Sequence, residues 1–560
     1  MGGLQVLERT YRHLNRYREV AAILAKHGFG DLLHMMGLDT YLEASLKSLL
    51  PRPSVDTSER PERVRLALQD LGPTFVKAGQ YLSTRADLLP VEYRRELAKL
   101  QDRVAPFPAD QARRAIEEDL GAPPSRLFSR FDDRPLAAAS IAQIHSAALR
   151  DGREVVVKVE RPRIRRVVAV DLEIMKHLAS LAEKHLAGWA RREPTRVVAE
   201  VARSLDREMD FSLEAAHTER FARQFSGDPT VLVPEVHRAL SSSRVLTLER
   251  VGGVKAADAA ALERAGLDPR LAAANIARHY LEMIFIHGFF HADPHPGNLF
   301  IQEDHSVAYV DFGLIGRLDR ATRESLADAI LAVSRRDEAA LGRALLALAE
   351  RDQEPDHRVF EADVGELMDQ YAYRPLAEWR LGRMLEQLFQ TTSHHGVRVP
   401  ADLFLMVKTL VELESLCLSF DPRFDAISAS APYVRRVQEE RASPARLAER
   451  MTEAGREALD LLASAPAEVR ELIRQARRGS LLIEFKHEGL EPALEELERT
   501  GNRLAYAIVL AALVIGSSLM MLAGLPPHWR GVPILGLGGF TLSAAMALRL
   551  LLAIRRHGRL

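Results

Sequence analysis

The feature that most constrains this chain is a pair of polar motifs on either side of a short hairpin pattern. The first motif, His-Ala-Asp-Pro-His-Pro-Gly-Asn, spans 291–298, and the second, Asp-Phe-Gly, spans 311–313. Between them, two β-type runs at 299–302 and 307–310 are separated by four polar, turn-like residues. If these runs pair as antiparallel strands, the residues just outside the hairpin converge at one end of it.

The two side chains brought together in this way are Asn298 and Asp311. An amide oxygen and a carboxylate suit Mg²⁺, a hard cation for which nucleotide phosphates supply further ligands. Asp293, at the start of the same loop, is the candidate catalytic residue that orients or deprotonates an attacking hydroxyl. Either motif alone is ordinary turn chemistry. In this order, they predict a phosphoryl-transfer site with ATP or ADP and Mg²⁺ as cofactors.

A site of this kind also needs a lysine on a strand to hold the nucleotide phosphates. Lys158 lies inside the β-branched run 154–159, which follows an Asp-Gly turn. The alternative is an exposed lysine on an edge strand, where it prevents aggregation. The expected partner carboxylate is Glu214, from the helix-like stretch 201–225, although most glutamates are solvated.

Residues 135–145 stand where a kinase carries its glycine-rich loop, but they contain no glycine. Alanine permits fairly close approach to phosphate yet resists positive φ, so this loop should be stiffer; the alternative is a small-residue packing turn. A hinge strand at 244–249 should offer backbone groups to adenine. The predicted nucleotide-contacting residues are Leu136, Ala137, Ala138, Ala139, Ser140, Ile141, Ala142, Gln143, Lys158, Glu214, Glu249 and Val251.

Taken together, these motifs resemble the UbiB/AarF-domain family of atypical, protein-kinase-like ATPases. The resemblance also rests on Lys77, Gly79 and Gln80 of a Lys-Ala-Gly-Gln sequence, and on Glu208 and Asp210. It implies that Lys77 and Gln80 reach from a helical extension into the nucleotide site, face Glu208 and Asp210, and block ordinary protein substrates. The residues alone show only that Lys77 and Gln80 share a helix face.

The resemblance further implies ATPase or limited autophosphorylating activity and a role in isoprenoid-quinone (ubiquinone) biosynthesis at a membrane. The expected substrate is a lipid quinone precursor on which the protein acts or which it extracts. One departure from ordinary kinases is Ala292, where their loop carries arginine. No long activation segment follows Gly313, so regulation by phosphorylation of such a segment is not expected.

The C-terminal region reads as a membrane hairpin. From 504 to 525 no charged residue interrupts an apolar run, which at a rise of about 1.5 Å per residue spans a hydrocarbon core of about 30 Å. A second apolar stretch runs from 532 to 548 after a short turn. Two buried helices of a bundle are the alternative. The basic residues outside the pair place both ends in the cytoplasm under the positive-inside rule; they are Arg499, Arg503, Arg555, Arg556 and Arg559.

The predicted location is therefore the bacterial cytoplasmic (inner) membrane, with two transmembrane helices and the kinase-like domain on the cytoplasmic side. Glycines at 516, 536, 538 and 539 suggest close helix contacts, and with them a homodimer. The formal charge of −1 excludes a general attraction to nucleic acid. Cys417 is the only cysteine, so intramolecular disulfides are excluded. The first twenty residues lack the apolar core of a signal peptide.

We expect an α+β chain with a two-lobed protein-kinase-like fold, a helical N-terminal extension and a C-terminal transmembrane helical hairpin. Helices are expected at 168–192 and 195–225, and a strand at 231–234. The expected regions are an N-terminal helical region (1–60), the extension with the Lys-x-Gly-Gln motif (61–125), an N-lobe with a helical insertion (126–255), a helical C-lobe (256–435), a charged connector (436–503) and the membrane hairpin (504–554).

Two functional classes remain open on the sequence. The first is a membrane-anchored kinase or ATPase that serves quinone biosynthesis. The second is a nucleotide-sensing scaffold that organises quinone-biosynthesis enzymes without transferring phosphate. A protein kinase with a protein substrate is a third reading, which an occluding extension disfavours. The sequence does not name the phosphoryl acceptor.

Overall fold

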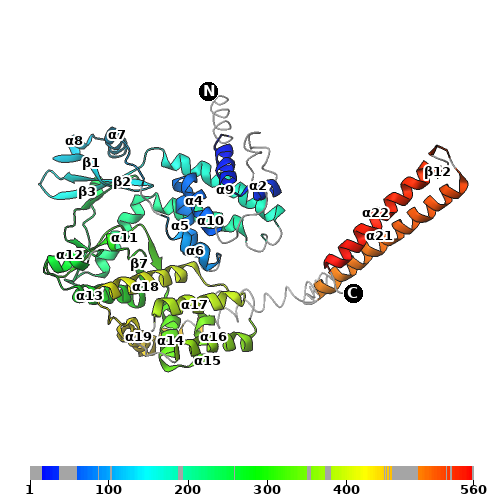
Figure 1. Cartoon of the computed structure of the whole chain (residues 1–560). Coiled ribbons are helices and arrows are strands. Elements are labelled where there is room, and N and C mark those ends of the chain that lie inside the picture. The colour runs from blue at the N-terminus through cyan, green and yellow to red at the C-terminus, as the bar shows by residue number, and fades with distance from the viewer. Residues whose placement is uncertain are drawn as a thin grey trace. The chain divides into compact units, whose positions relative to one another are not determined.

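The chain divides into two compact units, Met1–Arg450 and Met451–Leu560 (Figure 1). The structure is a computed structural model. It describes residues 15–36, 60–85, 88–100, 104–186, 189, 193–257, 259–349, 355–372, 380–446, 448–449, 451–452, 455–456, 490–524, 526–529 and 532–557. Most of the connector predicted at 436–503 lies outside these residues.

The first unit contains helices and short strands in the following order. They are α2 (Gly30–Met35), α4 (Arg60–Leu71), α5 (Pro73–Ser83), α6 (Val91–Leu97), α7 (Ala109–Leu120), α8 (Pro124–Leu127), β1 (Arg130–Ala138), β2 (Ala142–Ala148), β3 (Glu154–Glu160), α9 (Ile164–His185), α10 (Pro194–Glu208), α11 (Phe211–Gln224), β4 (Val231–Leu232), β5 (Val245–Glu249), β6 (Val254–Lys255), α12 (Ala259–Arg264), α13 (Pro269–Glu282), β7 (Phe289–His291), β8 (Leu299–Ile301), β9 (Val307–Tyr309), β10 (Ile315–Arg317), α14 (Arg320–Arg335), α15 (Glu338–Leu348), α16 (His357–Ala372), α17 (Leu381–His394), α18 (Ala401–Phe420) and α19 (Ala426–Ala442).

The first lobe of this unit, residues 104–249, is built on an antiparallel sheet of order β1-β2-β3-β5. Alternation along β3 assigns its two faces. Val155, Val157 and Val159 are fully buried against α7, in one cluster with Ile116. Lys158 therefore faces the other side of the sheet, where α11 packs (Figure 1). The sequence assigned α7 to the extension; the structure corrects this, because α7 covers the sheet.

The helical stretch expected at 195–225 is interrupted, and this prediction was wrong in one respect. Helix α10 ends at Glu208, and α11 begins at Phe211 after a break at Met209–Asp210. Asp210 is the N-cap of α11, since its carboxylate accepts from the Ser212 N–H at 3.0 Å. The break lets Glu214 occupy the first turn of a new helix directed at the sheet.

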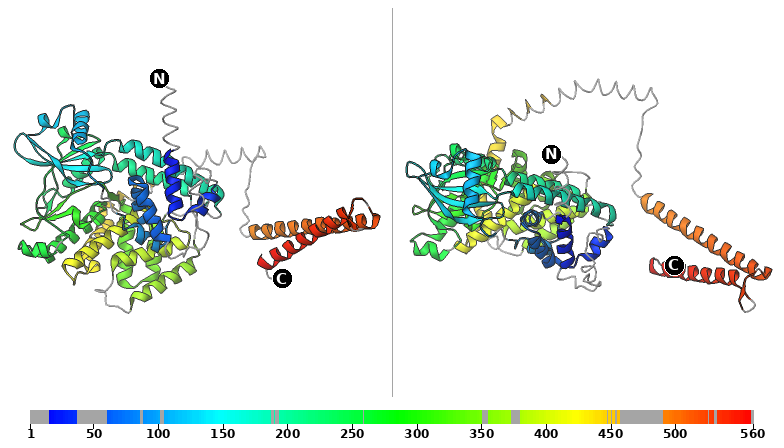
Figure 2. Two further views of the ribbon diagram at one scale, coloured as in Figure 1. Left: turned by 45° about the horizontal axis from the view of Figure 1, so that its top comes forward. Right: turned by 90° about the horizontal axis from the view of Figure 1, so that it is seen from above.

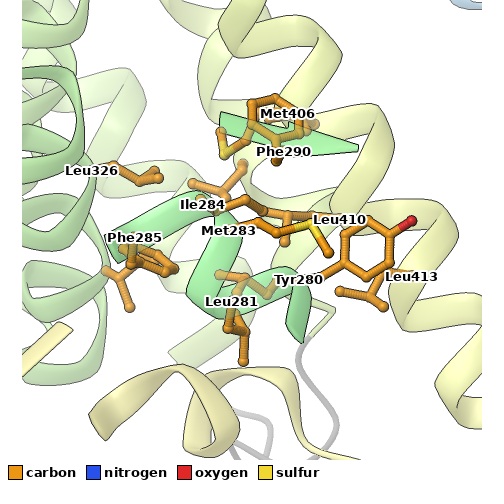
Figure 3. Packing of buried hydrophobic residues seen from close by; sticks show 14 of the residues in the cluster. Tyr280, Leu281, Met283, Ile284, Phe285, Phe290, Leu326, Met406, Leu410 and Leu413 are labelled. Atoms are coloured by element: carbon orange, nitrogen blue, oxygen red, sulfur yellow. The ribbon is translucent and has the colours of Figure 1, made fainter. Parts of the chain in front are cut away.

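The second lobe, residues 254–446, is mainly helical. Its largest buried cluster joins α13, the π-helical turn Met283–His287, α14 and α18. Figure 3 shows Tyr280, Met283, Ile284 and Phe285 packed between Leu326 on one side and Met406, Leu410 and Leu413 on the other. Two small sheets lie on this core, β4-β9-β8-β6 and β10-β7. The core thus provides a rigid base for the loops between these short strands.

Helices α4, α5 and α6 form the extension that the sequence predicted before the first lobe. Helix α5 packs on the first lobe, where Ala78 is buried with Val201, Leu205 and Met209. On its other side, Arg94 of α6 donates to Glu386 of α17 at 2.6 Å. The extension therefore contacts both lobes.

The second unit holds a helical hairpin of α21 (Leu490–Ala523) and α22 (Ile534–His557), joined through the short pair β11 (His528–Trp529) and β12 (Val532–Pro533). The two helices run side by side in both views of Figure 2. Among the described residues, Leu504–Ala523 is long and apolar enough to cross a membrane, whereas Ile534–Leu548 falls below the roughly 20 residues that a span needs. The prediction of two such helices is corrected to one candidate.

Candidate active site

The β8–β9 hairpin places the two predicted magnesium ligands. The strands pair antiparallel with Leu299 opposite Tyr309, as the sequence predicted. Just beyond them, the Val310 N–H donates to the Asn298 carbonyl at 3.0 Å. Asp311 follows directly and has φ +63°, a left-handed conformation that costs most residues but that aspartate tolerates. Asn298 and Asp311 therefore flank the same end of the hairpin.

Lys158 joins Glu214 and Asp311 across the two lobes. Its ammonium group donates to both Glu214 carboxylate oxygens, at 2.9 and 2.8 Å, and to Asp311 at 3.3 Å. The Lys158 side chain is 17% exposed and that of Glu214 is 6% exposed, whereas that of Asp311 is 52% exposed. The Lys158 ammonium group thus joins strand β3, helix α11 and the Asp-Phe-Gly turn. The expected Lys158–Glu214 ion pair is present.

The electrostatics of these groups follow from burial and mutual charge. Burial lowers the pKa of Lys158, but Asp311 and Glu214 outweigh it and raise that pKa well above its usual value. Burial raises the pKa of Glu214, and Lys158 opposes this rise. Lys158 lowers the pKa of Asp311 to about 2. We take all three groups as charged at neutral pH, because the ammonium group contacts both carboxylates directly.

The loop that carries Asp293 is held by four hydrogen bonds. Asp293 accepts from the Asn298 amide at 2.8 Å, so the amide nitrogen of Asn298 is engaged and its oxygen is left for a cation. His291 lies 3.0 Å from the Asp311 carbonyl through Nε2, and its Nδ1 accepts from the Asp293 N–H at 3.3 Å. From α18, Thr409 donates to the Ala292 carbonyl at 3.3 Å. Asp293, Asn298 and Asp311 therefore belong to one connected constellation.

These residues fit Mg²⁺ bound to a nucleotide better than a cation held by protein alone. In the described ranges, no group of three His, Cys, Asp or Glu side chains gathers to hold a metal, and His394 and His395 form no such group either. Asn298 and Asp311 offer two hard oxygen ligands, which is what Mg²⁺ takes when phosphates complete its shell. Bound Mg²⁺ would supply charge neutralisation at the phosphates.

The alanine-rich loop is tight, and part of it faces inward. It runs from Ala139 to Ile141 between β1 and β2, and the Ala139 N–H donates to the Ala142 carbonyl at 2.8 Å. Leu136 and Ala137 are exposed, whereas Ser140 and Ile141 are buried. Predicting a nucleotide contact for the Gln143 side chain was wrong, because it is fully buried and its oxygen accepts from the Phe107 N–H at 2.9 Å.

Of the hinge residues predicted to contact adenine, Val251 has the available backbone groups. Strand β5 is present at Val245–Glu249, one residue shorter than expected. The Glu249 N–H donates to the Glu235 carbonyl at 2.9 Å, and the Arg250 N–H to the Glu154 carbonyl at 3.0 Å, so both are used within the fold. No hydrogen bond from the described part of the chain reaches the Val251 backbone.

The extension approaches the site through Lys77. Lys77 forms an ion pair with Glu208, and its charge contributes to the low pKa of Asp311. Gln80 instead donates to the Leu100 carbonyl at 3.1 Å, within the extension, so this contact does not turn it toward the nucleotide. Gly79 has a packing role, because a Cβ there would lie 2.4 Å from a Leu100 methyl. Of the predicted facing pair, Glu208 meets Lys77 and Asp210 caps α11.

Sequence reasoning assigned no role to three residues that support the site: His291, Thr409 and His217. His217 of α11 lies 3.2 Å from the Phe312 carbonyl and packs edge-on against Phe289. His291 carried a signal, since it opens the loop motif, but its bond to the Asp311 carbonyl depends on the position of residue 311. Thr409 and His217 carried none, because their partners are more than ninety residues away.

Comparisons with known proteins identify the family of the chain. Three family models match: the ABC1 atypical kinase-like domain at residues 99–345, the UbiB helical domain at 364–425 and the ABC1/UbiB kinase-like C-terminal domain at 488–556. A Clostridium pasteurianum protein described as lying in the hydrogenase 1 5′ region is 30% identical over 97% of this chain and 99% of that protein.

Several relatives carry the description "probable protein kinase UbiB". The one from Marinobacter nauticus is 37% identical over 78% of this chain and 80% of its own length. The one from Pseudomonas putida is 34% identical over 90% of this chain and 93% of its own length. A solved complex of Rv3197 with erythromycin from Mycobacterium tuberculosis has 26% identity and a TM-score of 0.45, and covers 67% of this chain and 93% of that one. The chain belongs to the ABC1/UbiB family of atypical kinase-like proteins.

Proposed function

We propose that this protein is a membrane-anchored atypical kinase or ATPase that binds Mg²⁺ with ATP and supports isoprenoid-quinone (ubiquinone) biosynthesis. The observation that carries the proposal is the bridge from Lys158 to Glu214 and Asp311. A charged lysine held between two carboxylates, beside a free amide oxygen at Asn298, suits the phosphates of a metal-bound nucleotide. Membership of the kinase-like family is a second support for the proposal of nucleotide binding.

Within this proposal each residue has a defined task. Lys158 holds the nucleotide phosphates, and Glu214 positions Lys158. Asp311 and the Asn298 oxygen hold Mg²⁺. Asp293, oriented by the Asn298 amide, accepts the proton of the attacking hydroxyl or water. The Val251 backbone is the group offered to adenine.

The quinone role rests on the relatives described as UbiB and on the family resemblance of the motifs. The membrane role rests on the apolar helix Leu504–Ala523. We propose the cytoplasmic membrane as the location, with the kinase-like unit on the cytoplasmic side, because basic residues cluster outside the hairpin in the sequence. A lipid quinone precursor is then the proposed substrate, and neighbouring biosynthetic enzymes are proposed partners.

Self-association is a further part of the proposal. A Cβ at Gly536 or Gly539 would meet Met521 or Ser517 of the facing helix, so these two glycines serve the contact within one chain. Nothing described lies within 4 Å of a Cβ at Gly516 or Gly538, which leaves both to a second copy. Crosslinking of the protein in lipid should trap dimers; monomers alone would contradict this part.

The test of activity compares phosphate release by the wild type and by Asp293→Asn in lipid vesicles. The matched control is Asp369→Asn, the same change at an exposed aspartate of α16. We expect Asp293→Asn to lose at least about a hundredfold in rate, the scale of a general base, and the control to keep it. Equal background rates in all three proteins would favour the nucleotide-sensing scaffold. Metabolite profiling of a deletion strain, for an accumulated quinone precursor, tests the pathway separately.

A further inference from the structure

Four arginines gather around His217 and the Phe289 ring of β7. We call them the arginine patch: Arg207 of α10, Arg220 and Arg223 of α11, and Arg317 of β10. The Arg220 guanidinium lies 4.0 Å from the centre of the buried Phe289 ring, and that of Arg317 lies 5.9 Å from the same ring. These cation–π contacts hold two guanidinium groups at one aromatic ring.

The patch lacks the carboxylate partners that many other arginines of this protein have. On the same helix, Glu219 binds Arg238 at 2.6 Å. In the part of the chain that the structure describes, none of the four patch arginines forms an ion pair. Partial desolvation lowers the pKa of Arg220, and the charges of Arg317 and Arg223 lower it further. The group therefore carries uncompensated positive charge, which an anion would relieve.

One carboxylate does lie near the patch. Asp402, in the first turn of α18, is close enough for Arg207 and Arg317 to act on it. Partial burial raises the pKa of Asp402, and the two arginines oppose that rise. Asp402 forms no ion pair with either arginine within the described residues. The charge of Asp402 alone does not balance that of four arginines.

Short-range contacts connect the arginine patch to the active site. Arg317 pairs with Phe289 in the β10–β7 register, and the Ala292 N–H donates to the Leu314 carbonyl at 3.0 Å. His217, among the patch arginines, contacts the Phe312 carbonyl. Asp293 comes four residues after Phe289, which is about 13 Å at about 3.3 Å per strand residue. An anion bound at the patch would thus affect the positions of both the Asp-Phe-Gly turn and the catalytic loop.

In protein kinases, phosphate on the activation loop orders that loop by pairing with arginines. Here residues 313–321 pass directly into α14 and contain no Ser, Thr or Tyr, and the first hydroxyl residue after the Asp-Phe-Gly turn is Thr322 in the first turn of α14. The chain therefore presents a group of arginines beside its Asp-Phe-Gly turn without a separate activation segment between that turn and α14. Arginine's planar fork suits phosphate oxygens in particular.

We propose that the arginine patch binds a phosphate group carried by another molecule, and that its binding strengthens nucleotide binding at the Lys158 site. The ligand chemistry is a phosphate mono- or diester, supplied either by a phospholipid headgroup or by a soluble phosphate. Contacts from His217 to Phe312 and from β10 to β7 transmit the effect. The coupling, but not the anion binding itself, rests on the proposed function.

The test uses the full chain in phosphatidylcholine vesicles, with phosphatidylglycerol or inorganic phosphate added in separate arms. Nucleotide affinity is measured in each arm, and phosphate binding is measured by calorimetry without nucleotide. The patch variant is Arg220→Gln with Arg317→Gln. The control, Arg335→Gln with Arg343→Gln on α14 and α15, removes the same charge from exposed positions. We expect an anion to raise wild-type and control affinity by about fivefold or more, and to leave the patch variant unchanged.

The arms of the experiment distinguish the two possible sources of the phosphate group, and they distinguish failure of the arginine-patch proposal from failure of the proposed function. A response to phosphatidylglycerol alone assigns a lipid headgroup, and a response to inorganic phosphate alone assigns a soluble ligand; either supports the site. No response in the wild type, or an equal response in the patch variant, overturns it. Calorimetric phosphate binding that the patch variant loses, in a wild type that binds no nucleotide, would uphold the site and defeat the proposed function. Two milder variants cover the case in which the patch variant misfolds. Arg223→Gln leaves the Phe289 ring covered, and Arg220→Lys keeps the positive charge. Each should weaken the anion response partly, and a full wild-type response in both variants counts against the patch.

Discussion

Replacing Glu214 by glutamine should separate the ion pair from its packing, because the side chain keeps its shape and loses its charge. Breaking a buried pair costs about 3–5 kcal/mol when the remaining charge is left without a partner. Lys158 keeps Asp311 at 3.3 Å, and glutamine keeps one acceptor oxygen. We therefore expect a loss of about 1.5–3 kcal/mol, the value of a hydrogen bond to a charged group.

If the same free energy is lost in the transition state, phosphate release falls by about 10- to 150-fold. The assays are urea unfolding and phosphate release in lipid vesicles. Glu219→Gln is the matched control on the same helix, since its pair with Arg238 is exposed on both sides (35% and 48%) and should contribute under about 1 kcal/mol. The reasoning fails if Glu214→Gln unfolds at the wild-type urea concentration and keeps the wild-type rate.

Three further outcomes are expected. Asp311→Asn should weaken nucleotide binding when Mg²⁺ is present and leave it nearly unchanged in EDTA; equal affinities with Mg²⁺ would contradict the metal assignment. Lys158 holds the pKa of Asp311 at about 2, below the usual aspartate value of about 3.9, so the charged form adds stability above about pH 4 that is lost as the pH falls toward 2, and this acid limb of the unfolding curve should flatten in Asp311→Asn. Gly316→Ala would place a Cβ 2.0 Å from the Phe290 ring and should cost at least about 1–3 kcal/mol in urea unfolding; an unchanged midpoint would show that Phe290 can move away.

The parts of the site that could be predicted are those fixed by local geometry. A short antiparallel hairpin forces its flanking residues together, so the convergence of Asn298 and Asp311 followed from the sequence between them. Strand alternation likewise fixes the face of Lys158 once Val155 and Val157 are taken as core. The choice of Glu214 needed the order of the motifs, because several carboxylates share its stretch of chain.

The parts that sequence reasoning missed depend on distant contacts. Gln143 was placed at the nucleotide because of its position in the loop, but Phe107, thirty-six residues earlier, takes up its amide. The break before α11 carried a local signal, Asp210 before Ser212, which the apolar periodicity of 195–225 concealed. The second apolar stretch was overestimated, because Val532 and Pro533 form a strand and the helix begins only at Ile534.

The extension has a mechanical consequence. It is attached to the first lobe by Lys77–Glu208 and to the second by Arg94–Glu386. An ordinary two-lobed kinase opens and closes by hinge motion around its ligand. Here the extension is bonded to both lobes, so opening of the lobes must break one of these two ion pairs. We expect nucleotide exchange to become faster as ionic strength rises, because salt screening weakens these partly exposed ion pairs.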